Sequence, residues 1–453
     1  MRNARPLLIT LALGVFAGAL DLGVLSPALP AIGRQFGVPT GDLAWIFTIY
    51  LLVTVASITI ASTLADRLGR RSVYMGCVSL FAVGSILAIT APNYEIFLLA
   101  RAIQALGAGG VFPVATAAIG DVVPPEKRGS ALGLVAATWG LAAILGPTFG
   151  GLVTHFVSWR WIFTLNLPLA AVVLYLAKRN VPSTAPRVRG PLDVLGLSLL
   201  CVGLLLVMDG LTTARLITVL LGACVLTGFV FWERSIESPV VPLSLFTSPQ
   251  LAKTYLLEVT IGMLEGSLFF IPTVIVGAQG LSYAAAGLIA ALGALVFVIV
   301  IPASGRALDK IGSRDVLIVG TILTEIGLAI FALGFHSLAL TIVAMIVAGC
   351  GFGALLGAPT RYIVTSEAGA ARRATAVGLL SQALIVGQIL GSSMAGGVIG
   401  MATSEIHGYR EAYLCFCGIA FVALIIAATL KSRTAERQAA QPAQAAEGLA
   451  LER

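Results

Sequence analysis

Five ionisable side chains lie inside long apolar stretches, where charged residues are rare. Four are acids, Asp21, Glu258, Glu265 and Glu325, and the fifth is the base Arg101. A charged acid at the middle of a bilayer costs roughly 2.5–3.5 kcal/mol on insertion scales, and such residues usually serve a path for ions or substrates. Burial disfavours the charged form of a carboxyl group, so its pKa moves toward cellular pH and the group can load and release a proton. The pattern therefore predicts proton coupling.

Asp21 is the leading candidate for the proton-coupling residue, and Arg101 can pair with a neighbouring acid and assist release of the proton. Glu265 is the second candidate, near the midplane of its stretch, and Glu325 is the third. Glu258 precedes Glu265 by about two helical turns, so a helix presents both carboxyl groups on one face. Where a proton and a cationic compound compete for one carboxylate, exchange of the two follows. The alternative for each acid is a static hydrogen bond between helices.

The stretches around these residues have the length and composition of membrane-spanning helices. The chain of 453 residues is 58% hydrophobic and only 11% charged, whereas a soluble domain carries about 25% charged residues. Apolar runs of roughly 18 to 25 residues recur from end to end, which is the length of a helix that crosses the hydrocarbon core. Strand barrels show short alternating segments instead. The sequence therefore predicts an all-α integral membrane protein.

We predict fourteen membrane spans. The first is too long for the apolar core of a signal peptide and carries an acid in its second half. Basic residues gather in the turns after even-numbered spans, from Arg67, Arg70 and Arg71 after the second to Arg372 and Arg373 after the twelfth. The positive-inside rule therefore predicts that both termini are cytoplasmic. The spans lie near residues 7–30, 43–65, 72–90, 96–120, 129–153, 161–178, 192–210, 214–232, 251–275, 283–304, 315–334, 338–359, 374–399 and 410–430.

The remaining polar residues argue against several other classes of protein. The net charge of +7 comes from bases dispersed over separate loops, which is a poor surface for nucleic acid. The six cysteines fall inside apolar spans and indicate ordinary packing, without a disulfide or a metal site. No nucleophile–base set, metal-ligand spacing or phosphate-binding loop in the sequence indicates an enzyme.

Two pairs of similar segments indicate that the chain repeats itself. Residues 64–71 match 307–314, each with Asp-x-x-Gly in a basic turn, and residues 127–133 match 372–378 at nearly the same offset. Parallel halves of this kind rock about a central site in secondary transporters. The repeat predicts two six-helix halves, residues 1–180 and 251–432, with an inserted two-helix hairpin within 181–250 and a disordered cytoplasmic tail at 433–453.

Several motifs resemble those of the major facilitator superfamily, and more narrowly of its fourteen-span drug:proton antiporters. Residues 62–71, STLADRLGRR, are similar to the signature Gly-x-Leu-Ala-Asp-Arg-x-Gly-Arg-Lys, with Ser62 in place of the first glycine. Residues 101–107, RAIQALG, are similar to Arg-x-x-Gln-Gly-x-Gly, and residues 146–151, GPTFGG, to the motif that marks antiporters. Asp21 also fits the fourteen-span subgroup, although Gly23 stands where that subgroup usually has threonine. The resemblance covers nearly the whole chain and implies a major-facilitator fold.

The resemblance also implies roles for the glycines and charges of these motifs. The basic turns would form a cytoplasmic gate that holds the outward-facing state, although their bases also satisfy the positive-inside rule alone. Small residues along span five would form a hinge or a tight seal, or simply a packing groove. The gate residues are Asp66, Arg67, Gly69, Arg70, Arg71, Asp309, Gly312 and Arg314. Those of the antiporter motif are Gly140, Gly146, Pro147, Gly150 and Gly151.

Aromatic side chains in the spans can line a cavity for flat or cationic compounds, because aromatic faces attract them. Each can equally face lipid or pack between helices. The candidates for the cavity wall are Phe112, Trp139, Phe269, Phe270 and Tyr362. Trp45, Trp159, Trp161 and Trp232 lie near span ends and are predicted to anchor the protein at the membrane interface.

Together the residues and the resemblance indicate a secondary transporter. It would export small amphipathic, often cationic, compounds in exchange for protons, as in multidrug efflux, from the cytoplasmic membrane of a bacterium. The proton gradient would drive it without a cofactor, and the protein would be a monomer, as is common in the superfamily. Two alternatives stay open: a specific metabolite exporter or an uptake symporter on the same fold, and a membrane sensor that does not transport.

Overall fold

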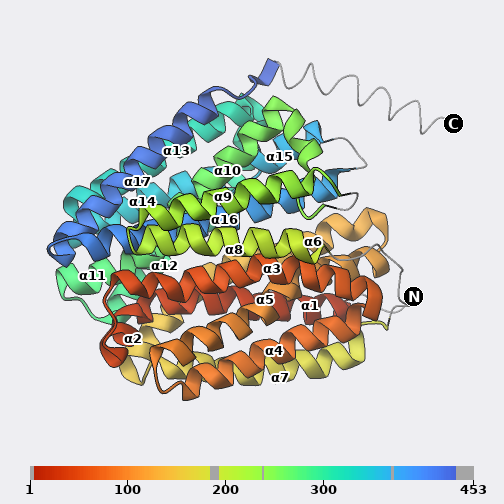
Figure 1. Ribbon diagram of the computed structural model, residues 1–453, viewed down its shortest axis with the longest axis horizontal. Helices are drawn as coiled ribbons and strands as arrows, with labels where there is room; N and C mark the ends of the chain where they lie inside the picture. The colour runs from red at the N-terminus through yellow and green to blue at the C-terminus, as the bar shows by residue number, and fades with distance from the viewer. Residues whose placement is uncertain (1–4, 184–192, 237–238, 369–371, 435–453) are drawn as a thin grey trace. The chain divides into compact units, whose positions relative to one another are not determined.

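The structure is a computed structural model that describes residues 5–183, 193–236, 239–368 and 372–434. These residues form helices joined by short connections, and no strand occurs among them (Figure 1). Fourteen helical segments are long and apolar enough to cross a membrane, which confirms the predicted fold class and number of spans. Most of the predicted tail and parts of the predicted hairpin segment lie outside the described residues.

The first six spans and the inserted hairpin are built from nine α-helices. They are α1 (Arg5–Leu25), α2 (Leu29–Phe36), α3 (Ala44–Leu68), α4 (Arg70–Thr90), α5 (Tyr94–Val122), α6 (Pro125–Phe156), α7 (Arg160–Asn180), α8 (Val194–Thr212) and α9 (Leu216–Glu233). The last six spans are built from eight more. They are α10 (Pro249–Ser267), α11 (Ile271–Gln279), α12 (Tyr283–Ile311), α13 (Ser313–Gly334), α14 (Leu338–Leu355), α15 (Pro359–Glu367), α16 (Arg373–Met401) and α17 (Glu405–Ala428).

Three spans are interrupted by short breaks beside prolines. The 3₁₀ turn η1 (Ser26–Ala28) separates α1 from α2, and η4 (Leu268–Phe270) separates α10 from α11. Pro359 opens α15, so the twelfth span continues to Glu367. Proline lacks an N–H group and fits the first turn of a helix, which explains why new helices begin at these points. The predicted end of the twelfth span at residue 359 is therefore wrong, because that proline starts its second half.

The backbone itself repeats. Among the described residues four glycines have positive φ, and they form two pairs with the same separation of 243 residues. Gly37 (φ 67°) and Gly280 (φ 65°) follow α2 and α11, and Gly69 (φ 89°) and Gly312 (φ 93°) separate α3 from α4 and α12 from α13. Residues other than glycine rarely adopt these conformations. The basic turns are thus single-glycine breaks, and Asp66 lies in the last turn of α3 rather than in a loop.

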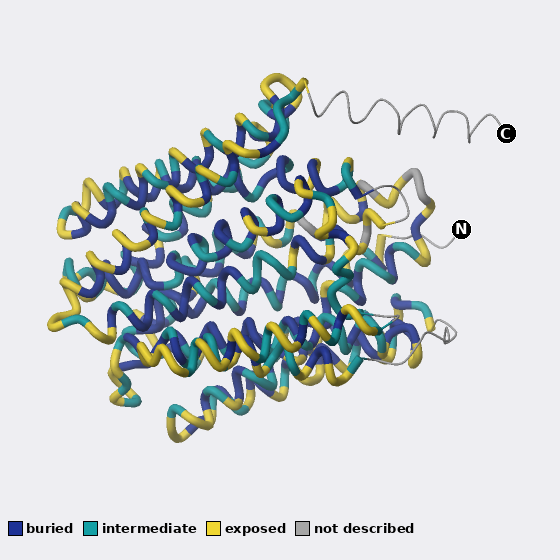
Figure 2. The backbone as a smooth tube through the Cα atoms, turned by 45° about the horizontal axis from the view of Figure 1, so that its top comes forward, coloured by how far each residue is buried: buried dark blue, intermediate teal, exposed yellow. Residues whose placement is uncertain are grey.

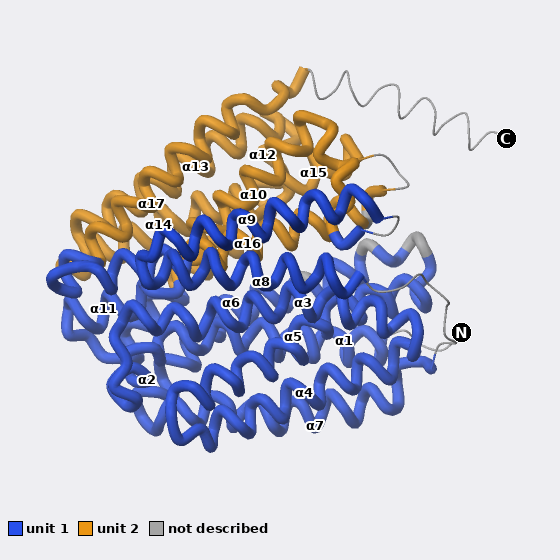
Figure 3. Tube along the Cα trace, viewed as in Figure 1, with its two compact units in different colours: residues 1–240, 269–291, 392–408 blue, residues 241–268, 292–391, 409–453 orange. Residues whose placement is uncertain are grey.

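The chain folds as two compact units (Figure 3). Unit 1 comprises Met1–Val240, Phe269–Ala291 and Ser392–Gly408, and unit 2 comprises Val241–Leu268, Leu292–Gly391 and Tyr409–Arg453. In unit 1, α1 packs against α5, α6 and α7, and α5 packs against α3 and α4. In unit 2, α13 packs against α14, and α15 packs against α10 and α13.

Exposed residues occur along the helices (Figure 2), and many of them are large apolar residues, as expected of surfaces that contact lipid tails. On α9 of the hairpin, more than half of the surface of Leu216, Ile217, Leu220 and Leu221 is exposed. Trp159, in contrast, is only 3% exposed and packs against Phe36, Phe97 and Phe163. Its predicted role as an interface anchor is therefore wrong, because three aromatic side chains of unit 1 enclose the ring.

Candidate functional site

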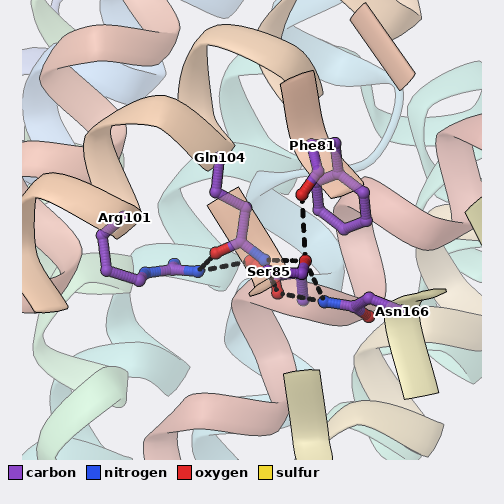
Figure 4. A network of polar contacts seen from close by, with 6 residues as sticks. Phe81, Ser85, Arg101, Gln104 and Asn166 are labelled. Atoms are coloured by element: carbon purple, nitrogen blue, oxygen red, sulfur yellow. Dashed lines mark hydrogen bonds and ion pairs between the residues drawn. The ribbon is translucent and has the colours of Figure 1, made fainter. Parts of the chain in front are cut away.

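A buried polar network links Ser85, Arg101, Gln104 and Asn166 in unit 1 (Figure 4), and Asp21 contacts three of them. Arg101 Nη1 lies 2.5 Å from Asp21 Oδ2, and neither side chain is exposed. The side-chain amides of Gln104 and Asn166 each donate a hydrogen bond of 2.8 Å to Asp21 Oδ1. Ser85 Oγ accepts from Gln104 (2.9 Å) and Asn166 (3.3 Å), and donates to the carbonyl of Phe81. The network therefore joins four spans through Asp21, Ser85, Arg101, Gln104 and Asn166.

Helix spacing and small residues bring these side chains together. Arg101 and Gln104 are three residues apart on α5, so both point to the same side of that helix. A Cβ atom on Gly84 would lie 2.5 Å from the backbone nitrogen of Gln104, and one on Gly107 would collide with the backbone of Phe81. The glycines thus let α4 and α5 approach closely, as small residues do in membrane helices.

Buried apolar side chains lie on either side of the network along α1 and α7. On α1, Asp21 lies between Val15, which belongs to one buried apolar cluster, and Val24, which belongs to another. Asn166 on α7 is flanked by the same two clusters in the same way. A low-dielectric surrounding strengthens the attraction between Asp21 and Arg101 and makes either charge costly without the other.

The guanidinium group of Arg101 has unused hydrogen-bonding capacity. Its Nε and Nη2 atoms have no hydrogen-bond partner among the described residues. The group lies 4.1 Å from the ring centroid of Tyr50, which is close enough for a cation–π interaction. Asp21, in contrast, accepts hydrogen bonds from three side chains, those of Arg101, Gln104 and Asn166.

The predicted acids of the second half lie in unit 2 and have separate partners. Gln388 on α16 donates a hydrogen bond of 2.9 Å to Glu265. Glu258 is buried and shares a hydrogen bond with the side chain of Thr360 on α15. Glu325 is half-buried on α13. Although both lie on α10, Glu258 and Glu265 therefore contact different neighbouring helices.

The first basic turn is a junction between four helices of unit 1. Arg70 lies 2.6 Å from Asp66 on α3 and 3.2 Å from Asp121 at the end of α5. Arg71 donates to the backbone carbonyl of Lys178 on α7, and Arg67 is exposed. Arg70 thus bridges two carboxylates, a geometry that suits the forked guanidinium group.

In the second basic turn the contacts are made by the backbone. Arg433 donates a hydrogen bond of 2.7 Å to the carbonyl of Asp309, whose side chain is exposed. A Cβ atom on Gly312 would lie 2.7 Å from the Cβ atom of Arg433. Arg314 is half-buried. The two turns therefore share their backbone conformation, but among the described residues ion pairs like those of Arg70 occur only in the first turn.

The glycines of span five form close contacts with α1 and with α12. A Cβ atom on Gly146 would lie 2.9 Å from the Cα atom of Gly23, and one on Gly150 would collide with the carbonyl oxygen of Val24. Gly151 packs against Gly287, whose own Cβ atom would collide with the carbonyl of Pro147. A Cβ atom on Gly23 would lie 3.3 Å from the Cα atom of Gly146, so a larger side chain at this departure from the subgroup pattern would crowd the contact. Gly140 is half-buried.

The predicted cavity residues differ in their burial. Phe269 stacks on Phe47 with ring centroids 4.3 Å apart, and Phe270 is fully buried. Phe112, Trp139 and Tyr362 are 40%, 46% and 40% exposed.

Ser85 and Asp121 lie in these sites but were not predicted from the sequence. Ser85 has no motif around it, and its only signal is a hydroxyl group in an apolar span. Asp121 follows an apolar run at a helix end, where an acid is unremarkable. Gln104 belongs to the motif of residues 101–107, but its contact with Asp21, like that of Asn166, depends on how the helices pack.

Comparisons with known proteins agree with the architecture. The family model described as Major Facilitator Superfamily matches residues 11–253 and 254–452. YfiU of Bacillus subtilis, an uncharacterized MFS-type transporter, is 32% identical over 412 residues, which are 87% of this chain and 79% of that protein. Stp of Mycobacterium tuberculosis, named a multidrug resistance protein, is 32% identical over 416 residues, 88% of this chain and 77% of that protein.

Solved transporter structures share the fold. A D-xylose-proton symporter superposes with a TM-score of 0.71 at 15% identity, covering 95% of this chain and 98% of that one. A peptide transporter superposes with a TM-score of 0.72 at 17% identity and covers 93% of each chain. The relatives are transporters rather than enzymes, and the fourteen spans make this a multi-pass protein of the cell membrane. The chain belongs to the Major Facilitator Superfamily of transporters.

Proposed function

We propose that the protein is a proton-coupled antiporter of the drug:proton type, which exports small amphipathic or cationic compounds by alternating access. The observation that carries the proposal is the fully buried pair of Asp21 and Arg101, held by Gln104 and Asn166 inside the membrane-spanning part of unit 1. A structural role alone does not need a buried ion pair, because apolar residues of similar volume often stabilise a protein equally well.

The pair provides a way to couple a proton to a change of conformation. While Asp21 is ionised, Arg101 is held between α1 and α5. Proton transfer to Asp21 removes the attraction, and Arg101 then keeps the side-chain oxygen of Gln104 and the rings of Tyr50 and Phe163 as its partners. Loss of the proton restores the pair. The packing of α1 against α5 therefore responds to the protonation state of one carboxyl group.

Two further observations support export. Gly146, Gly150 and Gly151 belong to the motif that resembles that of antiporters, and they let α6 approach α1 and α12 closely within unit 1. The relative Stp, similar over most of both chains, is named a multidrug resistance protein. The proton gradient would supply the energy, with about 2.3 kcal/mol per charge for each 100 mV of membrane potential.

The basic turns fit the role of a cytoplasmic gate in this proposal, with both termini in the cytoplasm. Arg70 would hold α3, α4 and α5 together in one state and release them in the other. We further propose that the protein acts as a monomer and needs no cofactor.

Dye transport tests the proposal. Cells that produce the protein should lower their ethidium content, and a protonophore should abolish the effect. Asp21→Asn should abolish efflux at an unchanged protein level, because the amide cannot carry the proton. Asp42→Asn is the matched control, since Asp42 is exposed in the same unit. Protonophore-resistant efflux, or full efflux by Asp21→Asn, would contradict the coupling, and accumulation of the dye would indicate uptake.

A further inference from the structure

A small cavity lies inside unit 1 next to the polar network of Asp21. Residues of α1, α4, α5 and α7 line it, and these are the same four helices that carry the network. On each helix one lining residue lies about one helical turn from a member of the network. These residues are Gly18, Phe81, Ala108 and Ala170. The cavity therefore adjoins the network on all four helices.

The cavity lies on the side of the network that faces the first basic turn. On α1 and α4 its residues precede those of the network, and on α5 and α7 they follow them. α4 begins at Arg70 of that turn, and α5 ends next to Asp121, an ion-pair partner of Arg70. Lys178, near the end of α7, accepts a hydrogen bond from Arg71. The helices thus run from the network past the cavity to the basic turn.

Buried polar groups continue from the cavity toward the same end of unit 1. The hydroxyl group of Tyr74 lies against Gly14 in the cavity wall, because a Cβ atom on that glycine would lie 2.0 Å from the hydroxyl oxygen. Tyr74 is fully buried and donates a hydrogen bond of 3.0 Å to the carbonyl of Thr10. The hydroxyl oxygen of Thr10 accepts a hydrogen bond of 3.0 Å from Asn180, the half-buried last residue of α7. Tyr74 and Thr10 therefore connect the cavity to a partly exposed side chain.

The opposite side of Asp21 is less favourable for a proton. Arg101 lies there on α5, and a buried guanidinium group repels a proton strongly in a low-dielectric surrounding. One turn further from the basic turn, the rings of Phe97, Trp159 and Phe163 pack edge to face. Along the helices, a proton on Asp21 thus has a positive charge and packed rings on one side and a cavity with an uncharged lining on the other.

We propose that this cavity is the route by which the proton leaves Asp21, and that Tyr74 is the residue that relays it. Gly14 precedes Asp21 by about 10 Å along α1, at 1.5 Å per residue. A single file of about three water molecules at hydrogen-bond spacing spans such a distance. Water in an apolar cavity needs polar partners. The protonated carboxyl group of Asp21 supplies one at the first end of the file, and the hydroxyl oxygen of Tyr74 supplies one at the last.

Every proton in the release step has a donor and an acceptor. The O–H bond of Asp21 breaks as the first water molecule takes the proton, and each water molecule passes one proton to the next. The hydroxyl oxygen of Tyr74 takes a proton from the last one and gives its own to water beside Asn180, so the tyrosine is unchanged. Asp21 returns to its ion pair with Arg101. This inference rests on the proposed function, in which the basic turns face the cytoplasm and the proton is released there.

Radiolytic labelling in ¹⁸O water tests the cavity without transport. Hydroxyl radicals formed from a bound water molecule attack the side chains next to it. In the full-length protein in lipid nanodiscs, the buried ring of Phe81 should be labelled, and the buried ring of Phe97 should not. Ala170→Leu fills the cavity and should lose the label on Phe81, whereas Ala171→Leu, at the exposed neighbouring position, should keep it. No label on Phe81 in the wild type, or equal labels on both rings, would overturn the route.

The rate of proton release tests the relay. Tetraphenylphosphonium added to the wild type should release protons, which a pH-sensitive dye detects in weakly buffered solution. Tyr74→Phe should release the same number of protons about tenfold more slowly, and Tyr175→Phe, at an exposed ring of α7, should release them at the wild-type rate. Tyr74→Phe should keep tetraphenylphosphonium counterflow, which needs no net proton movement and shows that the variant is folded. Release by Tyr74→Phe at the wild-type rate would overturn the relay.

Asp21→Asn distinguishes a failure of the route from a failure of the proposed function. This variant should release no proton when tetraphenylphosphonium is added. If it released as many protons as the wild type, the proposed coupling would fail, and the route from Asp21 would fail with it. If it released none while Tyr74→Phe released protons at the wild-type rate, the coupling would stand and the route alone would be wrong.

Discussion

The hydroxyl group of Ser26 donates a hydrogen bond of 2.6 Å to the backbone carbonyl of Phe269, which lies 243 residues later in the chain. The same separation relates Gly37 to Gly280. Ser26 lies in the break of the first span and Phe269 in the break of the ninth, so equivalent positions of the two sequence repeats meet here. The ring of Phe269 also stacks on Phe47 of the second span. Within unit 1 these contacts join a segment of the first repeat to a segment of the second. The contacts lie toward the side of the spans opposite the basic turns.

The stacked rings of Phe47 and Phe269 should stabilise that junction measurably. Aromatic pairs contribute about 0.5–1.5 kcal/mol beyond the burial of their surface. A double-mutant cycle with Phe47→Ala and Phe269→Ala should give a coupling energy of this size in the free energy of unfolding by detergent. The control cycle pairs Phe269→Ala with Phe156→Ala, a strongly exposed ring, and should give no coupling. A Phe47–Phe269 coupling near zero would mean that the rings do not stack in the membrane.

Removal of Arg101 alone should be more damaging than removal of both charges. Arg101→Gln leaves Asp21 as a buried charge without its counter-charge, which costs about 3–5 kcal/mol of stability. Asp21→Asn combined with Arg101→Gln should recover most of that loss, because no net charge stays buried. The melting temperature of the purified protein measures stability, and ethidium efflux should be absent from both variants. If the double variant were no more stable than Arg101→Gln, the ion pair would not be the source of the loss.

The spans and the buried acids could be predicted from the sequence because both depend on local composition. Apolar runs of membrane length identify helices without knowledge of their neighbours. Asp21 and Arg101 stood out because charge is rare in such runs. The two positive-φ glycines of the basic turns were also accessible, since the Asp-x-x-Gly pattern occurs twice.

The partners of these residues could not be predicted, because they depend on the packing of helices far apart in the chain. Asn166 reaches Asp21 only when α7 packs beside α1, and Ser85 joins the network only when α4 packs beside α5 and α7. Asp121 reaches Arg70 for a similar reason. Trp159 at a span end resembles an interface anchor until the surrounding rings are known.

The effect of replacing a glycine of span five should depend on the atoms that this glycine faces. Gly150→Leu would force side-chain atoms into the carbonyl of Val24, whereas a Cβ atom on Gly133 of the same helix meets nothing within 4 Å. Overpacking of this kind costs about 1–3 kcal/mol. Gly150→Leu should therefore lower the melting temperature and abolish efflux, and Gly133→Ala should change neither. Normal efflux by Gly150→Leu would show that α1 and α6 do not approach this closely.

The two ion pairs of Arg70 allow an experiment to distinguish a gate from a simple topological signal. If the bases of this turn only obey the positive-inside rule, lysine should replace Arg70 without effect, because it carries the same charge. In the structure Arg70 contacts Asp66 through Nη2 and Asp121 through Nε. The single ammonium group of lysine lacks this fork and cannot reproduce both contacts.

We therefore expect Arg70→Lys to lose most ethidium efflux, by about tenfold if the lost contact is worth roughly 1.4 kcal/mol. Its amount in the membrane should stay normal, since the positive charge that directs insertion is kept. Arg179→Lys, at an exposed position of α7, is the matched control and should transport normally. Asp121→Asn should reproduce the defect of Arg70→Lys, because it removes one of the same two contacts. Equal efflux by wild type and Arg70→Lys would leave the positive-inside rule as the sufficient explanation of this turn.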